Sequence, residues 1–423
     1  MLALIFVNVV INYMDRSNIA VAASAIGEEF RFSSIQIGLI LSAFGWTYVA
    51  LQIPGGMMVD RFGARILYTF SLITWSLATL FQGLAKGFIS LFALRLATGA
   101  FEAPAFPINN RVATSWFPEG ERASAIAIYT SGQFLGLAFL TPILTAIQLY
   151  MGWRGLFIVT GIAGIVWGVV WYKLYRDPAD HPKVNAEELD KIERGGGLIH
   201  GKKEKATASS SSFNTGDLRE VLSHRKLWGI YLGQFAVNST LWFFLTWFPK
   251  YLVDYRHMDF IKSGFLASLP FIAAFGGVIF SGFLSDYLIR RKVKPGIARK
   301  SPIIIGLLLS ISIIGANYVN SPALIILFMA IAFFGNGLAS ITWVFVSTLA
   351  PKHLVGLTGG VFNFIGGLAA VIVPIVIGFL VENGNFSPAL IFIGSLAFLG
   401  ACSYLFLVGK VERIVSTNVS TEN

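Results

Sequence analysis

Long apolar stretches separated by short polar turns dominate the chain. Twelve of them are about as long as a helix that crosses the roughly 30 Å hydrocarbon core of a bilayer. They cover approximately residues 2–26, 36–59, 66–85, 88–110, 123–150, 156–174, 226–249, 263–283, 302–319, 322–347, 356–381 and 386–409. We therefore predict an all-α integral membrane protein with twelve transmembrane helices.

Composition and charge placement agree with a membrane protein. The 423 residues are 55% hydrophobic and 13% charged, with a net charge of +10. Most lysines and arginines fall in loops on one side of the predicted spans, which the positive-inside rule assigns to the cytoplasm together with both termini. The charge therefore indicates topology and not a nucleic-acid partner.

The first apolar run is not a cleavable signal peptide. It carries Asp15 and Arg16 and lacks a charged leading region. We expect a short cytoplasmic leader to precede residue 1. The single cysteine, Cys402, excludes an intramolecular disulfide framework.

The chain contains an internal repeat. Asp60 lies in the loop after the second span and Asp286 lies 226 positions later, after the eighth. Pro118 precedes Pro142 by nearly the distance that separates Pro351 from Pro374. Two landmarks at one offset indicate two homologous six-span halves, as in secondary transporters. The loop residues expected to fasten one conformation of the cytoplasmic face are Gly56, Asp60, Arg61, Gly63, Arg65 and Asp286.

The domain boundaries follow from this repeat and from one long polar segment. Residues 1–176 and 224–410 form the predicted six-helix bundles, and 411–423 form a cytoplasmic tail. Residues 177–223 contain a short amphipathic stretch and a low-complexity run, a composition that cannot bury a core and is typical of a linker.

Away from their ends, the spans contain four charged residues: Asp15, Arg16, Arg95 and Glu102. Each charge at membrane depth costs about 2.5–3.5 kcal/mol on insertion scales, so all four need partners or a wet cavity. A structural ion pair that locks two helices is one interpretation, and a substrate or proton site is the other. The five histidines lie outside the span centres, which leaves Asp15 and Glu102 as the candidate membrane proton carriers.

These charges suggest a coupling mechanism. With both acids ionised, the two carboxylates balance the two arginines, and the site attracts an anion weakly. With both acids protonated, the planar Arg16 guanidinium is free to bind a carboxylate. We expect Arg95 to pair with ionised Asp15 and to release it on protonation, although a purely structural role for Arg95 is equally open.

Polar and helix-breaking residues mark other parts of the spans. Gln133 and Asn363 fall near equivalent positions of the two halves and could bind the hydroxyl groups of a polyol, or join helices. Pro104, Pro107 and the stretch 335–337 are expected to break spans four and ten, where transporter cavities use loosened backbone.

The chain resembles the major facilitator superfamily, since residues 56–65 match its signature between spans two and three and Arg95-x-x-x-Gly99 matches its fourth-span motif. Within it, the segments 12–16, 101–107, 129–134 and 332–337 are similar to the anion:cation symporter family. This resemblance implies proton-coupled import of sugar-acid anions by alternating access. It also implies a location in the bacterial inner membrane and a monomer. It implicates Tyr13, Arg16, Tyr48, Gln133, Gln234, Ser340, Thr342, Trp343 and Asn363 in substrate contact, and Asp15, Arg95 and Glu102 in proton coupling.

We therefore expect a symporter for an aldonate such as galactonate, with protons as the coupling ion and no metal or organic cofactor. A carrier of hexarates or other organic anions, or an organic-phosphate exchanger, is the alternative within transport; exchange is less favoured because span seven lacks an arginine. A receptor would bind the ligand without uptake. An enzyme would need a nucleophile–base pair or metal ligands, which the spans do not offer.

Overall fold

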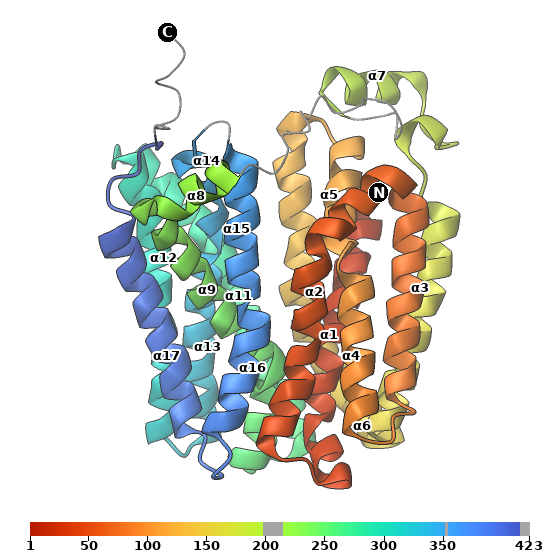
Figure 1. Cartoon of the computed structure of the whole chain (residues 1–423), viewed down its shortest axis with the longest axis vertical. Coiled ribbons are helices and arrows are strands. Elements are labelled where there is room, and N and C mark those ends of the chain that lie inside the picture. Colours follow the sequence, from red (N-terminus) through yellow and green to blue (C-terminus); the bar gives the residue numbers. More distant parts are fainter. Residues whose placement is uncertain (198–214, 352–353, 415–423) are drawn as a thin grey trace. The chain divides into compact units, whose positions relative to one another are not determined.

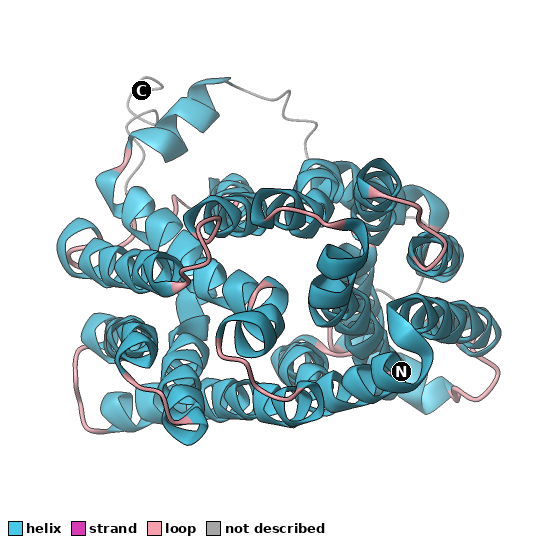
Figure 2. Ribbon diagram, turned by 90° about the horizontal axis from the view of Figure 1, so that it is seen from below, coloured by secondary structure: helices cyan, strands magenta, loops and turns pink. Residues whose placement is uncertain are grey.

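The computed structural model describes residues 1–197, 215–351 and 354–414, and every regular element within these ranges is a helix (Figures 1 and 2). The low-complexity run 206–212 and most of the tail lie outside the described residues. Contacts group the chain into two units, which are Met1–Ala208 with Leu245–Ser268, and Ser209–Phe244 with Leu269–Asn423.

The first unit is built around α1 (Leu2–Phe30), which packs most extensively against α6. A capping box starts α2, in which Ser33 Oγ accepts from the Gln36 amide and Gln36 Oε1 accepts from the Ser33 amide. The other helices are α2 (Ser34–Phe62), α3 (Ala64–Gln82), α4 (Phe88–Glu102), α5 (Ala105–Trp116), α6 (Glu119–Leu174), η1 (Pro178–Asp180), α7 (Ala186–Arg194), α10 (Phe248–Lys250) and η2 (Tyr251–Tyr255).

The second unit contains α9 and a series of helices interrupted by short 3-10 or π-helical turns. Its core includes Tyr231, Phe345, Phe362 and Tyr404, all fully buried. The elements are α8 (Thr215–Ser223), α9 (Arg225–Thr246), most of α11 (Phe260–Arg290), α12 (Pro295–Ser310), η3 (Ile311–Tyr318), α13 (Pro322–Leu338), η4 (Ala339–Thr342), α14 (Trp343–Leu349), α15 (Val355–Gly367), α16 (Ala369–Leu380), α17 (Ser387–Cys402) and η6 (Ser403–Leu407).

The helices account for the predicted spans. Nine helical segments of the described ranges are long and apolar enough to cross a membrane. One of them, α6, combines two spans, since Gly152 has a left-handed φ of 69° and separates two helices there. The two remaining spans are α1 and α9, whose polar residues lower their hydropathy. The prediction of an all-α membrane protein is confirmed.

The predicted breaks in spans four and ten differ in position. In span four the break lies at Pro104, between α4 and α5, as expected. In span ten α13 continues to Leu338, and the 3-10 turn η4 follows at 339–342. The glycines at 335 and 337 serve helix contact instead, because a Cβ at Gly337 would lie 2.1 Å from the Ala274 carbonyl oxygen. This close backbone contact explains why small residues occur before the break.

Residues 245–268 pack with the first unit, although the sequence places them in the second half. The first turns of α11 cross α6 closely, since a Cβ at Gly264 would lie 2.4 Å from Thr145 Oγ1. Lys250 is buried next to Gly27 of α1 and pairs with Asp254 one turn later.

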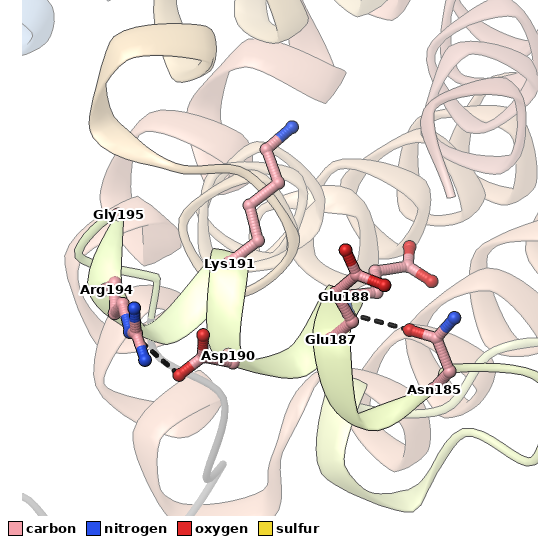
Figure 3. Close-up of a pocket in the computed structure, with 7 residues that line it drawn as sticks. All are labelled: Asn185, Glu187, Glu188, Asp190, Lys191, Arg194 and Gly195. Carbon is pink, nitrogen blue, oxygen red and sulfur yellow. Dashed lines mark hydrogen bonds and ion pairs between the residues drawn. The ribbon is translucent and has the colours of Figure 1, made fainter.

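The amphipathic stretch predicted in the linker forms α7, which Asn185 caps by accepting a hydrogen bond from the Glu188 amide at 2.7 Å. Figure 3 shows this helix beside a surface hollow lined by Asn185, Glu187, Glu188, Asp190, Lys191, Arg194 and Gly195. Lys191 Nζ pairs with Glu121 Oε1 at 3.0 Å, and Ile192 is buried. The linker helix is thereby attached to the start of α6.

Helices α2 and α4 touch at Gly99. A Cβ there would lie 2.2 Å from the Phe44 carbonyl oxygen and 2.6 Å from Thr47 Oγ1. Thr47 Oγ1 also donates to the Leu96 carbonyl at 2.6 Å. The motif glycine therefore brings the aromatic residues of α2 close to the charged residues of α4.

Substituting Gly99→Ala should destabilise the first unit, because an overpacked contact typically costs about 1–3 kcal/mol. Gly276→Ala, in the interior of α11 with no neighbour within 4 Å of the added Cβ, is the matched control and should be neutral or stabilising. Thermal unfolding in detergent measures both. Equal melting temperatures for the two variants would contradict the close contact.

Candidate functional site

An ion pair lies in the interior of the first unit. Arg16 Nε donates to Glu102 Oε1 at 2.7 Å, joining α1 to the end of α4. The two side chains are 5% and 0% exposed. Arg16 Nη2 and Glu102 Oε2 have no hydrogen-bond partner among the described residues. The pair is therefore buried but incompletely satisfied, with one donor and one acceptor still free to bind a further group.

Aromatic rings surround the Arg16 guanidinium. Its Cζ lies 4.8 Å from the ring centre of Tyr13, 4.7 Å from Tyr48 and 5.0 Å from Phe44. Phe106 of α5 lies at 5.9 Å. Rings at these distances attract a cation through their negative faces and hold its plane in place. The cage keeps Arg16 charged and oriented in an apolar interior.

Arg95 contacts Asp15 at its main chain and not, as expected, at its carboxylate. Asp15 Oδ2 accepts a hydrogen bond from Trp75 Nε1 at 3.0 Å. Arg95 Nη1 donates to the main-chain oxygen of Asp15 at 3.2 Å, and not to its carboxylate. The indole from α3 occupies the carboxylate, while Arg95 Cζ lies 5.3 Å from the Phe44 ring. Arg95 thus holds the backbone of α1 in this conformation.

Tyr13 connects the cage to the fifth span. Its hydroxyl donates to Gln133 Oε1 at 2.7 Å, so the carbonyl of that amide is occupied and its NH₂ group remains a donor. Gln133 and Tyr48 are partly exposed. The structure therefore brings together, around the first-unit ion pair, the residues predicted in the first half: Tyr13, Arg16, Tyr48, Arg95, Glu102 and Gln133.

The second unit holds another polar cluster. Thr342 Oγ1 donates to Gln234 Oε1 at 2.6 Å, and Gln234 Nε2 donates to Asn238 Oδ1 at 3.4 Å. A Cβ at Gly366 would lie 2.6 Å from the Gln234 side chain, so the glycine provides room for that amide. Among the other predicted residues, Ser340 and Asn363 are partly exposed, and Trp343 is half exposed with its ring edge-on to Phe362.

The signature loop between α2 and α3 turns at Gly63, whose φ is 77°. Arg65 Nε donates to the Tyr172 carbonyl at 3.0 Å and lies over the Tyr172 ring, which attaches the loop to the end of α6. Arg61 is exposed and lies over Phe62, and Gly56 has open space around it. The side chains of Asp60 and Asp286 lie outside the described part of the structure, so their expected role stays a prediction.

Sequence reasoning missed Trp75 and Phe44. An indole N–H or an aromatic ring in a span gives a weak signal in a chain with 10 tryptophans and 37 phenylalanines. Phe106 lies within the segment 101–107 that is similar to the symporter family, but the sequence assigned it no role of its own. Among the described residues, no group of three His, Cys, Asp or Glu is placed to hold a metal ion.

The family model described as Major Facilitator Superfamily matches residues 5–298, well over half of the chain. The chain belongs to the Major Facilitator Superfamily. It is a multi-pass membrane transporter and not an enzyme, as predicted.

Relatives of this transporter carry names that refer to sugar acids. It is 53% identical over 413 residues to the D-galactonate transporter of Escherichia coli O6:H1, covering 98% of this chain and 96% of that protein. It is 42% identical to the Probable galactarate/D-glucarate transporter GarP of Escherichia coli K12, covering 98% and 95% of the two chains.

Solved structures support the fold. The bacterial homologue of the human lysosomal transporter Spinster has a TM-score of 0.76 at 20% identity, with 96% of each chain covered. The D-xylose-proton symporter has a TM-score of 0.74 at 13% identity, covering 97% of this chain and 98% of that one. At these identities the likeness establishes the fold alone.

A double-mutant cycle at Arg16 and Glu102 should reveal strong coupling. Arg16→Met or Glu102→Leu alone leaves an unpaired buried charge, which costs about 3–5 kcal/mol, whereas the double variant should recover most of that loss. The exposed pair Lys191 and Glu121 is the control and should couple by less than about 1 kcal/mol. Unfolding in detergent measures each cycle. Additive losses at Arg16 and Glu102 would show that the two charges do not depend on each other.

Proposed function

We propose that the chain is a proton-coupled symporter that imports sugar-acid monoanions, most closely an aldonate such as galactonate. The observation that carries this proposal is the Arg16–Glu102 pair, a guanidinium of fixed orientation whose partner is a titratable carboxylate. The names of the similar transporters supply the substrate class.

Protonation of Glu102 exposes the anion site. While Glu102 is ionised, it occupies Arg16 and repels a second carboxylate. Once it is protonated, it no longer competes, and the guanidinium can bind the substrate carboxylate in two-point geometry. The aromatic cage keeps the guanidinium plane in position through both states. Anion binding is thereby linked to proton uptake at the same pair.

Asp15 is the second proton carrier in this proposal. Its carboxylate is held by Trp75, while Arg95 holds its main-chain oxygen. Protonation removes the charge that Arg95 and the indole stabilise, which loosens the attachment of α1 to α3 and α4. We propose that this loosening accompanies alternating access, with the loop residues Gly56, Asp60, Arg61, Gly63, Arg65 and Asp286 stabilising one state.

Amides and hydroxyls bind the polyol chain of the substrate. Tyr13 and Gln133 in the first half serve this role together with Tyr48. In the second half we assign it to Gln234, Ser340, Thr342, Trp343 and Asn363. Because Thr342 occupies the Gln234 carbonyl and one amide N–H of Gln234 donates to Asn238, the remaining N–H is a donor that suits a hydroxyl or carboxylate oxygen.

We also place the protein in a bacterial inner membrane as a monomer, with both termini in the cytoplasm. Residues 1–176 and 224–410 are the two bundles, joined by the linker 177–223 and followed by the tail 411–423. Protons are the coupling ion, and no cofactor is required.

A carrier of hexarates such as galactarate or glucarate is the second candidate, favoured by the 42% identical relative. A hexarate has a carboxylate at each end and therefore needs a second cationic or donor-rich site. The donor-facing Gln234 amide could serve that purpose. An organic-anion exchanger is a further alternative, in which protons would not drive uptake.

Uptake into proteoliposomes, with a panel of hexonates and hexarates, tests the function. Two coupled carboxyls per monoanion would carry a net charge of +1 inward, so an inside-negative potential of 100 mV should add about 2.3 kcal/mol per cycle. We expect aldonate-dependent inward current even at zero pH gradient. Electroneutral uptake would leave one coupled proton, preference for hexarates would favour the second candidate, and binding without uptake would indicate a receptor.

The variant Glu102→Gln should uncouple binding from pH. With one linked proton, parental affinity falls about tenfold per pH unit once Glu102 ionises, and the uncharged amide should remove that unit of slope. The variant should still bind and exchange substrate across the membrane but should not concentrate it. Arg16→Ala is the control and should fail to bind at any pH. Calorimetry from pH 5 to 9 provides the measurement, and an unchanged slope would exclude Glu102 from coupling.

A further inference from the structure

We propose that buried waters between α1, α3 and the second half of α6 form a proton path from Asp15 to the cytoplasmic end of the first unit. Asn12 anchors the waters nearest to Asp15. This inference rests on the proposed role of Asp15 as a proton carrier, and it assigns that proton a route apart from Arg16. We call this region the α1–α3–α6 seam.

The seam follows one face of α1. Asn8, Asn12 and Asp15 are spaced by four and three residues, so their side chains lie on the same helix face. Trp167 Nε1 of α6 donates to Asn8 Oδ1 at 2.7 Å, and Trp75 Nε1 of α3 donates to Asp15 Oδ2 at 3.0 Å. This polar face of α1 is therefore enclosed by α3 and α6.

Ser76 lies at the level of Asn12 in this seam. A Cβ at Gly164 would lie 2.1 Å from Ser76 Oγ and 3.9 Å from Ile11 Cγ2, so α1, α3 and α6 meet at that position. Gly164 is placed between Thr160, which accepts from Asn18 Nδ2, and Trp167, which bonds to Asn8. The Ser76 hydroxyl is thus opposite the part of α1 that carries Asn12 and Asp15.

Several polar atoms of this seam lack partners. Both amide atoms of Asn12, Asp15 Oδ1 and Ser76 Oγ have no hydrogen-bond partner among the residues that the structure describes. All three residues are 0% exposed. A buried polar group without a partner costs about 1–3 kcal/mol, and folded proteins usually satisfy such groups with internal water. A cluster of four such atoms, one of them the free oxygen of the Asp15 carboxyl, therefore indicates bound water.

The unsatisfied groups continue toward the start of α3. The Tyr68 ring packs edge-on against Trp75 at 5.9 Å, and Asn109 of α5 lies next to the Tyr68 hydroxyl. Both side chains are fully buried, and apart from their contact with each other neither has a hydrogen-bond partner among the described residues. Tyr68 is four residues from Ala64, where α3 begins at the proposed cytoplasmic face. The polar groups thus extend from Asp15 toward that face.

The path differs from the anion site in its contacts, although Glu102 lies close enough to act electrostatically on both Asp15 and Tyr68. Arg95 reaches its main-chain oxygen from α4, and Glu102 and Arg16 form their own pair. Consecutive side chains on a helix point about 100° apart, so Asp15 and Arg16 face different sides of α1. In the proposed step, Asp15 gives its proton to the first water, and each water passes one proton onward to bulk solvent. The carboxylate left behind accepts the Trp75 hydrogen bond, and no other bond forms or breaks.

Asn12→Leu tests the path, because it keeps the side-chain volume and removes both polar atoms. In proteoliposomes of the full chain, net galactonate uptake and the proton signal of a trapped pH dye should slow by about tenfold, a barrier increase of about 1.4 kcal/mol. Substrate exchange, which needs no net proton release, should stay within about threefold of the parental rate. Asn12→Ser, which retains a hydroxyl and room for water, should restore most of the proton signal.

Asn18→Leu is the matched control. Asn18 is on the same helix, fully buried and also has an unpartnered oxygen, but it lies on the far side of Asp15 from Tyr68. In Asn18→Leu, the proton signal and substrate exchange should slow by the same factor, or both should stay at the parental rate. Equal losses of exchange and proton signal in Asn12→Leu would mean that Asn12 is only structural, and an unchanged proton signal would exclude the path.

X-ray hydroxyl-radical footprinting tests the waters without any substrate, so its result does not depend on the transport function. Radicals generated from bound water should label Tyr68 and Trp75 although both are 0% exposed. Trp247, which is also 0% exposed and lies outside the seam, is the dry control. Labelling of Tyr68 and Trp75 as low as that of Trp247 would show that the seam is dry and would overturn the proposal.

Discussion

The burial of the Arg16–Glu102 pair is the constraint on which the first unit depends. Removing two charges from water costs several kcal/mol per ion, and their attraction repays this only with further hydrogen bonds or favourable surroundings. The surroundings here are aromatic rings from α1, α2 and α5. Rings from three helices therefore surround one guanidinium, whose partner Glu102 comes from a fourth, and the close contact at Gly99 brings α2 and α4 together there.

A buried pair of this kind is a poor source of stability and a suitable switch. Replacing both partners by apolar residues is often neutral, whereas removing one charge is expensive. In the mechanism that we propose, a substrate carboxylate substitutes for Glu102 only when Glu102 loses its own charge. Competition between two carboxylates for one cation would then couple a proton to an anion without any large movement at the pair itself. The unpartnered Arg16 Nη2 and Glu102 Oε2 supply one donor and one acceptor for that exchange of partners.

The charged residues and the fold could be predicted from the sequence, but their pairing could not. Charges are so costly in a span that Asp15, Arg16, Arg95 and Glu102 are conspicuous in any arrangement. Sequence spacing determines which residues share a face of one helix, yet it does not tell which faces of different helices meet. The expected contact between Arg95 and the Asp15 carboxylate failed for this reason, since Trp75 reaches the carboxylate from a third helix.

The same limit explains the break in span ten and the polar face of α1. Glycines signal both a loosened backbone and a close helix contact, and only the neighbouring helix decides between them. Gly337 lies against the α11 backbone, and the break follows in the next turn.

Asparagines in a span are equally ambiguous, because an amide can join helices or hold water. Asn8 and Asn18 each bond across the α1–α6 contact, whereas Asn12 bonds to no described residue although it lies one turn from Asp15. The polar atoms of the fully buried Asn12 therefore do not help to hold helices together. Given the proton-carrying role that we propose for Asp15, the position of Asn12 beside it is better explained by transport than by folding.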